Sequence, residues 1–375
     1  MSVAETKNDL VPKSTVPERP IVLRAGSPYC IDDWFGGPAG EYDFRLVNEE
    51  AAGMEVYLQD VATERIFLEV EHFGRGATRA VTASVPPGSY RWVCITDYTI
   101  KFSHPVTVTG DPLPYDVYGI TPLTGIDLRI PINAYVAWLT GQLPTLIEQL
   151  EHLRTSVRAG DIAAAKLDWL TAHLTYETLG GAYGAYGEAG DSVNGDPPRG
   201  VNAADADFAG FRKIEAMLWS DRPAHSIAPH VDALLEGVGD LATVLAGPNA
   251  IRPIDVGRRI HEILEDTLHK DLNGVGDAGS RTELATLDAN ITGTWHALDP
   301  LMTVLLEQDP YLDETEQQLR ETQRLVQSYH HEDGWLPLAS LTTRQRAGIN
   351  AAVQQCVELL SHAAVVLDPR NSARR

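Results

Sequence analysis

Two pairs of histidine and glutamate are the residues whose types and spacing indicate chemistry. His173 and Glu177 are four residues apart, and His261 and Glu265 repeat that spacing. On a helix, side chains four residues apart project from the same face, so each pair can present an imidazole nitrogen and a carboxylate to one cation. The repeated pattern therefore predicts ligands for a metal ion.

Glu215 adds a third carboxylate to this set. In the segment DADFAGFRKIEAMLWSD it shares a helical face with apolar residues, where a carboxylate is costly unless a cation, a proton or a donor meets it. Two nitrogens and three carboxylates suit iron or zinc inside a helix bundle. Two alternatives stay open. Each pair alone is a common helix-surface pairing, and Arg212, three residues before Glu215, can satisfy that carboxylate without a metal.

The elements that must position these residues are helices. The helix carrying His173 and Glu177 is expected to end at Gly180 and Gly181. Both side chains are expected on the shoulder of an apolar stripe, and His261 is expected to face the core. The stripe is formed by Ala163, Leu167, Leu170 and Leu174. The run GGAYGAYG follows no strand, so it is not a dinucleotide-binding loop; we expect it to be non-helical and to pass close to a neighbouring helix.

Hydrophobic periodicity divides the chain into two domains. Residues 1–19 are polar and are expected to be a flexible N-terminus. A period of two over residues 20–110 predicts a small β-sandwich, a proline-rich linker covers 111–130, and a helical period over 131–368 predicts a multi-helix bundle. The expected helices lie near residues 132–158, 161–179, 205–219, 228–246, 252–271, 281–308, 312–331 and 341–366.

Composition narrows the class of protein. The 30 Lys and Arg residues against 52 Asp and Glu residues give a net charge of −22, which argues against a nucleic-acid surface and favours attraction of cations. The sequence contains no run of 18 apolar residues, so we expect no membrane-spanning helix. The N-terminus has no apolar segment behind its charges, so the sequence as it stands indicates a cytoplasmic protein, or a periplasmic or extracellular one if an export signal has been removed.

Three cysteines are too few for a disulfide framework. Cys30 and Cys94 either flank a second metal site or form a disulfide. His104 follows Cys94 by ten residues and no methionine follows it in the domain, which argues against a type-1 copper centre. Cys356, on an apolar helix, is expected in the core.

Four segments resemble the imelysin-like domain of the EfeO iron-uptake proteins: AHLTYETLGGAYGAYG, GFRKIEAMLW, HEILED and TLDANITGT. The resemblance spans roughly residues 20 to 366. It implies a cupredoxin-like sandwich followed by an imelysin-like double helix bundle, with a metal site in the cleft between the two halves. Iron (Fe2+) is the ion it implies, with zinc or copper as alternatives, and a permease and a haem peroxidase are the implied partners. Cys30 and Cys94 match the two cysteines of the family's sandwich.

The sequence departs from the family at two histidines. Arg212 stands where the family has the histidine of Gly-x-His-x-x-Glu, and Arg281 stands at a second family histidine. A guanidinium cannot ligate a cation. The first hypothesis is therefore a metal-binding protein of the EfeO type. The alternative is a cytoplasmic metal-dependent enzyme of the Fe/O2 type in which Arg212 and Arg281 bind an anionic substrate, and a third is an interaction protein that has lost the site.

Overall fold

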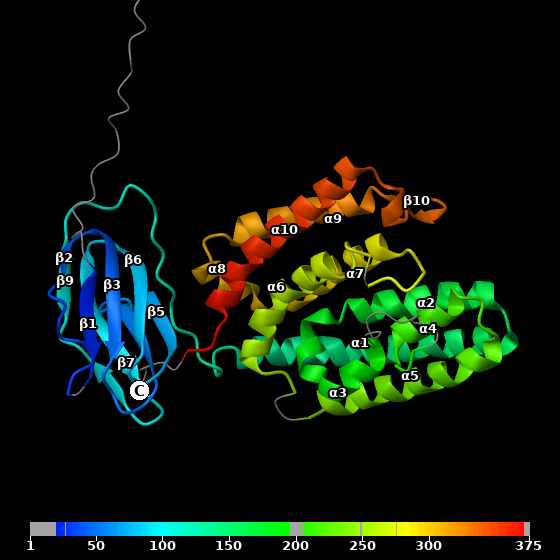
Figure 1. Ribbon diagram of the computed structural model, residues 1–375, viewed down its shortest axis with the longest axis horizontal. Coiled ribbons are helices and arrows are strands. Elements are labelled where there is room, and N and C mark those ends of the chain that lie inside the picture. The colour runs from blue at the N-terminus through cyan, green and yellow to red at the C-terminus, as the bar shows by residue number, and fades with distance from the viewer. Residues whose placement is uncertain are drawn as a thin grey trace, which may run out of the picture. The chain divides into compact units, whose positions relative to one another are not determined.

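The computed structural model describes residues 20–26, 28–195, 204, 206–247, 250–274 and 276–370. The chain forms two compact units that divide between Pro122 and Leu123, the first built of strands and the second of helices (Figure 1). The predicted order of an all-β domain followed by a helical domain is confirmed. Each unit buries its own apolar core.

The N-terminal unit contains two sheets. One has the strand order β1-β3-β6, in which β1 is parallel to β3 and β6 is antiparallel to it. The other has the order β2-β9-β7-β4-β5, and β8 pairs with β7. The strand bounds are β1 Ile21–Ala25, β2 Gly37–Pro38, β3 Gly40–Asn48, β4 Met54–Asp60, β5 Ile66–Phe73, β6 Thr78–Val85, β7 Gly88–Ile95, β8 Ile100–Phe102 and β9 Val106–Thr109.

Alternation of side chains builds the core between these sheets. Along β3 the buried residues are Tyr42, Phe44, Leu46 and Asn48, every second position, as the period of two predicts. Phe44 meets Trp92 of β7 edge to face, with ring centroids 5.3 Å apart. Because residues of both sheets share one buried cluster, the sheets pack face to face as a sandwich.

The C-terminal unit consists of helices in two groups (Figure 1). Helices α1 to α5 pack on one another, as do α6, α7, α9 and α10, while α2 and α7 connect the groups. No described helix has the length and apolar character needed to cross a membrane. The helix bounds are α1 Arg129–Ala159, α2 Ile162–Glu177, α3 Tyr183–Asn194, α4 Phe211–Leu218, α5 Ala224–Leu245, α6 Pro253–His269, α7 Glu283–Leu298, α8 Met302–Gln308, α9 Leu312–Gln327 and α10 Thr343–Val366.

The first two helices show how the sequence places the site. Helix α1 buries leucines at alternating spacings of four and three, the repeat that keeps one face toward the core. Gly160 ends it in the left-handed conformation, with φ of 75°. Asp161 then accepts a hydrogen bond from the Ala164 amide and caps α2. The turn between Gly160 and Asp161 therefore fixes where α2 begins.

Three expectations for the helices are wrong. The run GGAYGAYG and the residues after it form a 3-10 turn (Gly180–Ala182) and helix α3, which is kinked at Gly187, where φ is 52°. Close packing on α5 stabilises this segment although its glycines disfavour a helix. The helix expected over 281–308 is interrupted at Asp299–Leu301, where Pro300 lacks an amide donor. The helix expected over 312–331 ends at Gln327, and β10 (His330–His331) pairs with β11 (Gly334–Trp335) beyond it.

Candidate metal-binding site

Helix α2 buries both His173 and Glu177, which are 0% and 5% exposed. Its buried stripe is Ala165, Trp169, Ala172, His173, Tyr176 and Glu177. The expected stripe through Leu167 is wrong, since Leu167 is 69% exposed. Small alanines let α2 pack closely, and the two aromatic side chains supply the apolar surface that the leucines were expected to give. The two polar residues therefore lie within the packed face and not on its shoulder.

Aromatic rings fix the orientation of His173. Its imidazole stacks on Trp169 at a centroid distance of 4.6 Å, and Phe211 of α4 meets it at 5.4 Å. Nε2 of His173 lies 2.9 Å from Oε1 of Glu177, a close contact that lacks hydrogen-bond geometry. Neither ring nitrogen has a hydrogen-bond partner among the described residues. Buried polar atoms without hydrogen bonds are costly, and the only polar contact of the ring nitrogens within the described structure is the one between Nε2 and Glu177.

Arg212 of α4 is the cation at the centre of the site. Its Nη2 donates to Oδ1 of Asp271 at 3.0 Å, and its Nη1 lies 3.7 Å from Oε2 of Glu215. Burial alone would lower the pKa of Arg212, but the negative charges of Asp271, Glu215 and Glu177 raise it. The guanidinium is therefore a permanent charge in this interior. We call His173, Glu177, Arg212, Glu215 and Asp271 the Arg212 cluster.

A loop after α6 holds Glu215. Its Oε1 accepts hydrogen bonds from the backbone amides of Ala278 and Ser280, both at 3.0 Å. The carboxylate of Asp277 in turn accepts from the amides of Arg281 and Thr282 and folds this loop back on itself. Oε2 of Glu215 is buried, has no hydrogen-bond partner among the described residues, and faces Arg212. One oxygen of Glu215 is thus held by the loop amides, and the other faces the Arg212 guanidinium.

The second group of helices completes the cluster. Asp271 follows the C-terminus of α6, and Asn290 comes from α7. The Asn290 amide lies between Oε2 of Glu177 and Oγ1 of Thr267, at 3.1 and 3.0 Å. Residues of α2 and α4 therefore meet residues from α6 and α7 at one buried place.

The three carboxyl groups of the cluster respond differently to burial. Burial raises the pKa of Glu177, but His173, Arg212 and the Tyr183 hydroxyl outweigh it, and the net pKa is lowered. Burial raises the pKa of Asp271 to about 6 although Arg212 opposes it. Burial also raises the pKa of Glu215, again opposed by Arg212. Glu177 is therefore the most firmly ionised of the three.

The structure does not bring the second predicted pair into this cluster. His261 and Glu265 lie on α6, with Nε2 and Oε2 3.8 Å apart, and their side chains are 24% and 45% exposed. No hydrogen bond or ion pair joins either residue to the cluster within the described parts of the chain. Nδ1 of His261 is buried without a hydrogen-bond partner there. His261 was expected to face the core, but it lies at the edge of the buried face of α6 and is only partly buried. The buried face itself is formed by residues that include Ile260, Leu264 and Thr267.

The two arginines proposed to bind an anion lie in different settings. Arg212 is paired with carboxylates, as described above, and is not presented to an anion. Arg281 is exposed and has a φ of 61°, a conformation that its backbone hydrogen bond to Asp277 stabilises. The described geometry does not assemble them into one anion site.

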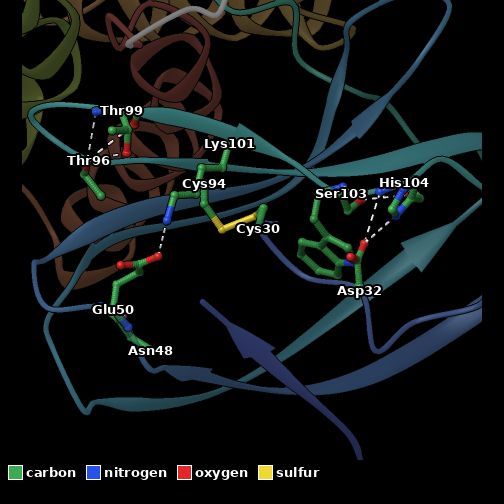
Figure 2. Close-up of a disulfide and its surroundings, with 11 residues drawn as sticks. Cys30, Asp32, Asn48, Glu50, Cys94, Thr96, Thr99, Lys101, Ser103 and His104 are labelled. Carbon is green, nitrogen blue, oxygen red and sulfur yellow. Dashed lines mark hydrogen bonds and ion pairs between the residues drawn. A yellow bond between two sulfur atoms is a disulfide. The ribbon is translucent and has the colours of Figure 1, made fainter. Parts of the chain in front are cut away.

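In the N-terminal unit, Cys30 and Cys94 form a disulfide (Figure 2). The sequence leaves open a second metal site or a disulfide at these two cysteines, and the structure has the disulfide. Sulfur atoms in a disulfide are not thiolates and do not act as thiolate ligands of a metal. Lys101 pairs with Glu50 beside it, and Nδ1 of His104 lies 3.2 Å from Asp32 (Figure 2). Cys356 is free and buried, as expected from its apolar helix.

Three residues of the site were not identified from the sequence: Asp271, Asn290 and Gly276. Asp271 did give a signal, because it continues the buried positions 260, 264 and 267 of α6, where a carboxylate is out of place. Gly276 gave none. A Cβ there would meet both Arg212 and Asp271, so the ion pair packs directly on this glycine. Such a role depends on a contact between distant segments.

Among the described residues, no group of three or more His, Cys, Asp or Glu side chains is arranged to hold a metal ion. The donors of the cluster nevertheless suit one, because an imidazole and carboxylate oxygens are ligands for iron and zinc. His173 and Glu177 already face each other, and Oε2 of Glu215 is unpaired apart from Arg212. For Glu215 to act as a third ligand, the Arg212 side chain would have to move away from its Oε2 atom.

Comparison with known proteins gives one consistent result. No family model matches the chain. The protein named Iron uptake system component EfeO of Yersinia pestis is 24% identical over 337 residues, covering 88% of this chain and 86% of the relative. The protein of the same name from Escherichia coli O157:H7 is 22% identical over 333 residues, with the same coverage. This chain resembles EfeO.

The resemblance to EfeO extends over both units, because an alignment of 337 residues is longer than either unit. The relationship expected from the sequence is confirmed at this level. Both EfeO relatives are named as components of iron uptake systems.

Proposed function

We propose that this protein is a component of an iron-uptake system and binds Fe2+, or a related divalent ion such as zinc or copper, at the Arg212 cluster. The observation that carries the proposal is the buried imidazole of His173, which has no hydrogen-bond partner among the described residues and lies against the ionised Glu177. The likeness to EfeO proteins over 88% of the chain supports iron as the cargo.

In this proposal the protein captures an ion and performs no turnover. His173 and Glu177 bind it first, since their donor atoms already lie 2.9 Å apart. Glu215 and Asp271 are the further carboxylates, and each must exchange part of its contact with Arg212 for the ion. His261 and Glu265 are proposed as an accessory pair on α6, supported by the unpartnered Nδ1 of His261 within the described structure.

The disulfide supports a location outside the cytoplasm. Disulfides persist in oxidising compartments and are rare in the cytosol. The pair Cys30–Cys94 therefore favours the periplasmic or extracellular alternative over the cytoplasmic one. A permease and a haem peroxidase are the partners proposed there, by analogy with the resembling family.

The test is metal binding by the purified chain. Wild-type protein titrated anaerobically with Fe2+ is expected to bind about one ion per chain and to melt at a higher temperature, because a ligand at about 100 times its Kd adds about 2.7 kcal/mol. Glu177→Gln should abolish the shift, since the amide keeps the shape and loses the charge. Exposed Glu148→Gln is the matched control and should keep it. Absence of a stoichiometric ion and of any shift in the wild type, with Fe2+, Zn2+ and Cu2+ alike, would overturn the proposal.

A further inference from the structure

The segment between α6 and α7 packs on the Arg212 cluster with almost no apolar side chains. Residues 276–282, with the sequence GDAGSRT, form no helix or strand, and none of them is buried. Ala278 carries the single apolar side chain of this segment. A segment with few buried apolar contacts has low local stability. We call residues 276–282 the strap.

One end of the strap lies against the ion pair of the cluster. Gly276 packs so closely that a Cβ there would lie 2.2 Å from Oδ1 of Asp271 and 3.3 Å from Nη2 of Arg212. These two atoms form the hydrogen bond between Arg212 and Asp271. The strap therefore covers the ion pair with its backbone and not with a side chain.

The middle of the strap is attached to α4. The backbone amides of Ala278 and Ser280 both donate to Oε1 of Glu215, at 3.0 Å. Between them Gly279 has a φ of 136°, and a Cβ there would lie 2.8 Å from Cβ of Trp219. Two hydrogen bonds to one carboxylate oxygen, together with close backbone packing, thus hold the strap on α4.

Asp277 gives the strap a shape of its own. Its carboxylate accepts hydrogen bonds from the amides of Gly279, Arg281 and Thr282 and from the hydroxyl of Ser280. These bonds lie within the strap, so they are kept when the strap moves away from α4. The strap can therefore move as one unit that exchanges its contacts with the cluster for contacts with water.

The groups beneath the strap are more deeply buried than the strap itself. Glu215 is fully buried, and the side chains of Arg212 and Asp271 are 12% and 10% exposed. The helices around them pack into the apolar core of the unit, so moving a helix would uncover apolar surface at a large cost in free energy. Lifting the strap exchanges two hydrogen bonds for bonds to water and uncovers little apolar surface. The strap is therefore the part of this enclosure that opens most readily.

We infer that the strap is a lid that opens and closes over the Arg212 cluster and sets the rate at which solutes reach it. The inference goes beyond the proposed function, because it concerns access to the cluster and holds whether or not an ion binds there. Glu215 holds the lid closed through its Oε1, and Asp277 maintains the shape in which the lid closes.

Asp277→Ala tests the lid without changing a residue of the cluster. The variant is expected to raise the hydrogen-exchange rates of the Ala278 and Ser280 amides at least tenfold, measured by NMR. It should also raise at least fivefold the rate at which phenylglyoxal modifies Arg212, measured by mass spectrometry of peptides. An Arg212 rate that stays at the wild-type value would overturn the inference, whether or not the amides of the strap exchange faster.

Asp60→Ala is the matched control. The carboxylate of Asp60 also accepts hydrogen bonds from amides of its own turn, those of Ala62 and Thr63, but in the N-terminal unit. This variant should change neither the exchange of the strap nor the rate at Arg212. Exposed Arg346 should be modified equally fast in all three proteins, which controls for the reagent.

The wild-type protein decides the question if Asp277→Ala fails to fold. Below the unfolding transition, exchange in the strap and modification of Arg212 are expected to depend little on urea, because opening of the lid exposes little surface. The amides of α1 should exchange with the steep urea dependence of global unfolding. An equally steep dependence for Arg212 would show that the cluster is reached only by unfolding and would overturn the inference. These measurements use no metal ion, so their outcome is separate from that of the metal titration.

Discussion

At the scale of single residues, the site depends on how a buried arginine shares its charge. The sequence offers two interpretations of Arg212, a contact for an anionic substrate or an i, i+3 partner that satisfies Glu215 without a metal. In the structure it is the counter-ion of Asp271 and Glu215, and it also lowers the pKa of Glu177. A guanidinium can satisfy several carboxylates at once because its donors are spread over a planar fork. Arg212 cannot itself ligate a metal ion, but it pairs with Glu215 and Asp271 and lowers the pKa of Glu177.

Asp271 gives this arrangement a measurable dependence on pH. Its pKa is raised from 3.8 to about 6 in the folded protein. Between these values the folded state binds more protons than the unfolded state, so ionisation of Asp271 lowers the free energy of unfolding as the pH rises from about 4 to about 6. At about 1.4 kcal/mol per pKa unit the loss is roughly 3 kcal/mol.

Asp271→Asn should abolish that part of the pH dependence. Urea unfolding of the variant at several values between pH 4 and 6.5 is expected to show a flatter profile than the wild type shows. The change in slope is the readout, because the variant also lacks the ion pair that ionised Asp271 makes with Arg212. Exposed Asp313→Asn should leave the wild-type slope intact. Equal slopes for wild type and Asp271→Asn would show that Asp271 is not the group that titrates.

At the scale of elements, close helix contacts hold the cluster together. Helix α7, which supplies Asn290, also approaches the end of α2 at Gly293. A Cβ at Gly293 would lie 2.5 Å from the backbone oxygen of Thr178, one residue after the α2 helix that ends at Glu177. The position of Glu177 relative to Asn290 therefore depends on a glycine that carries no chemistry itself.

Gly293→Ala is expected to destabilise the helical unit by about 1–3 kcal/mol, because the backbone must shift to admit one methyl group. Gly141→Ala is the matched control: Gly141 is an exposed position inside α1, and its Cβ would meet nothing within 4 Å. That control should gain about 0.5–1 kcal/mol, since alanine favours the helix. Chemical denaturation followed by circular dichroism at 222 nm measures both. Similar effects of the two substitutions would contradict a role for close packing at Gly293.

At the scale of the whole molecule, two units with separate cores share one chain. The disulfide lies wholly within the N-terminal unit and joins residues 64 positions apart. A cross-link that closes a loop of this length stabilises by about 4 kcal/mol in the chain-entropy account. Its contribution should therefore be confined to one unit.

Replacing both cysteines, as Cys30→Ala/Cys94→Ala, is expected to reduce the stability of the N-terminal unit by about 4 kcal/mol and to leave the helical unit unchanged. Peptide-resolved hydrogen exchange distinguishes the units, with loss of protection expected over 21–109 and not over 129–366. Reductant added to the wild type should reproduce the effect and should not affect the double variant. Equal loss of protection in both units would show that the two cores do not unfold separately.

Local patterns along the chain are enough to predict the order of the two domains and to single out His173, Glu177 and Glu215 as polar residues in unusual positions. The period of the apolar residues, two in strands and near four in helices, is a local property of the sequence. A charged residue within an apolar stripe can likewise be recognised without knowing which residues lie beside it in space. The resemblance to EfeO was also carried by local motifs.

Which of these residues meet depends on the packing of helices that are distant in the sequence, and the structure shows it. It joined Arg212 to Asp271 across 59 positions, placed Asn290 against Glu177, and left His261 and Glu265 outside the cluster. It also made the glycine-rich run a 3-10 turn and the start of the kinked helix α3, because packing on α5 compensates for a poor helix propensity. Such contacts depend on how distant helices approach one another, and that approach is set by packing of the whole unit rather than by any single segment.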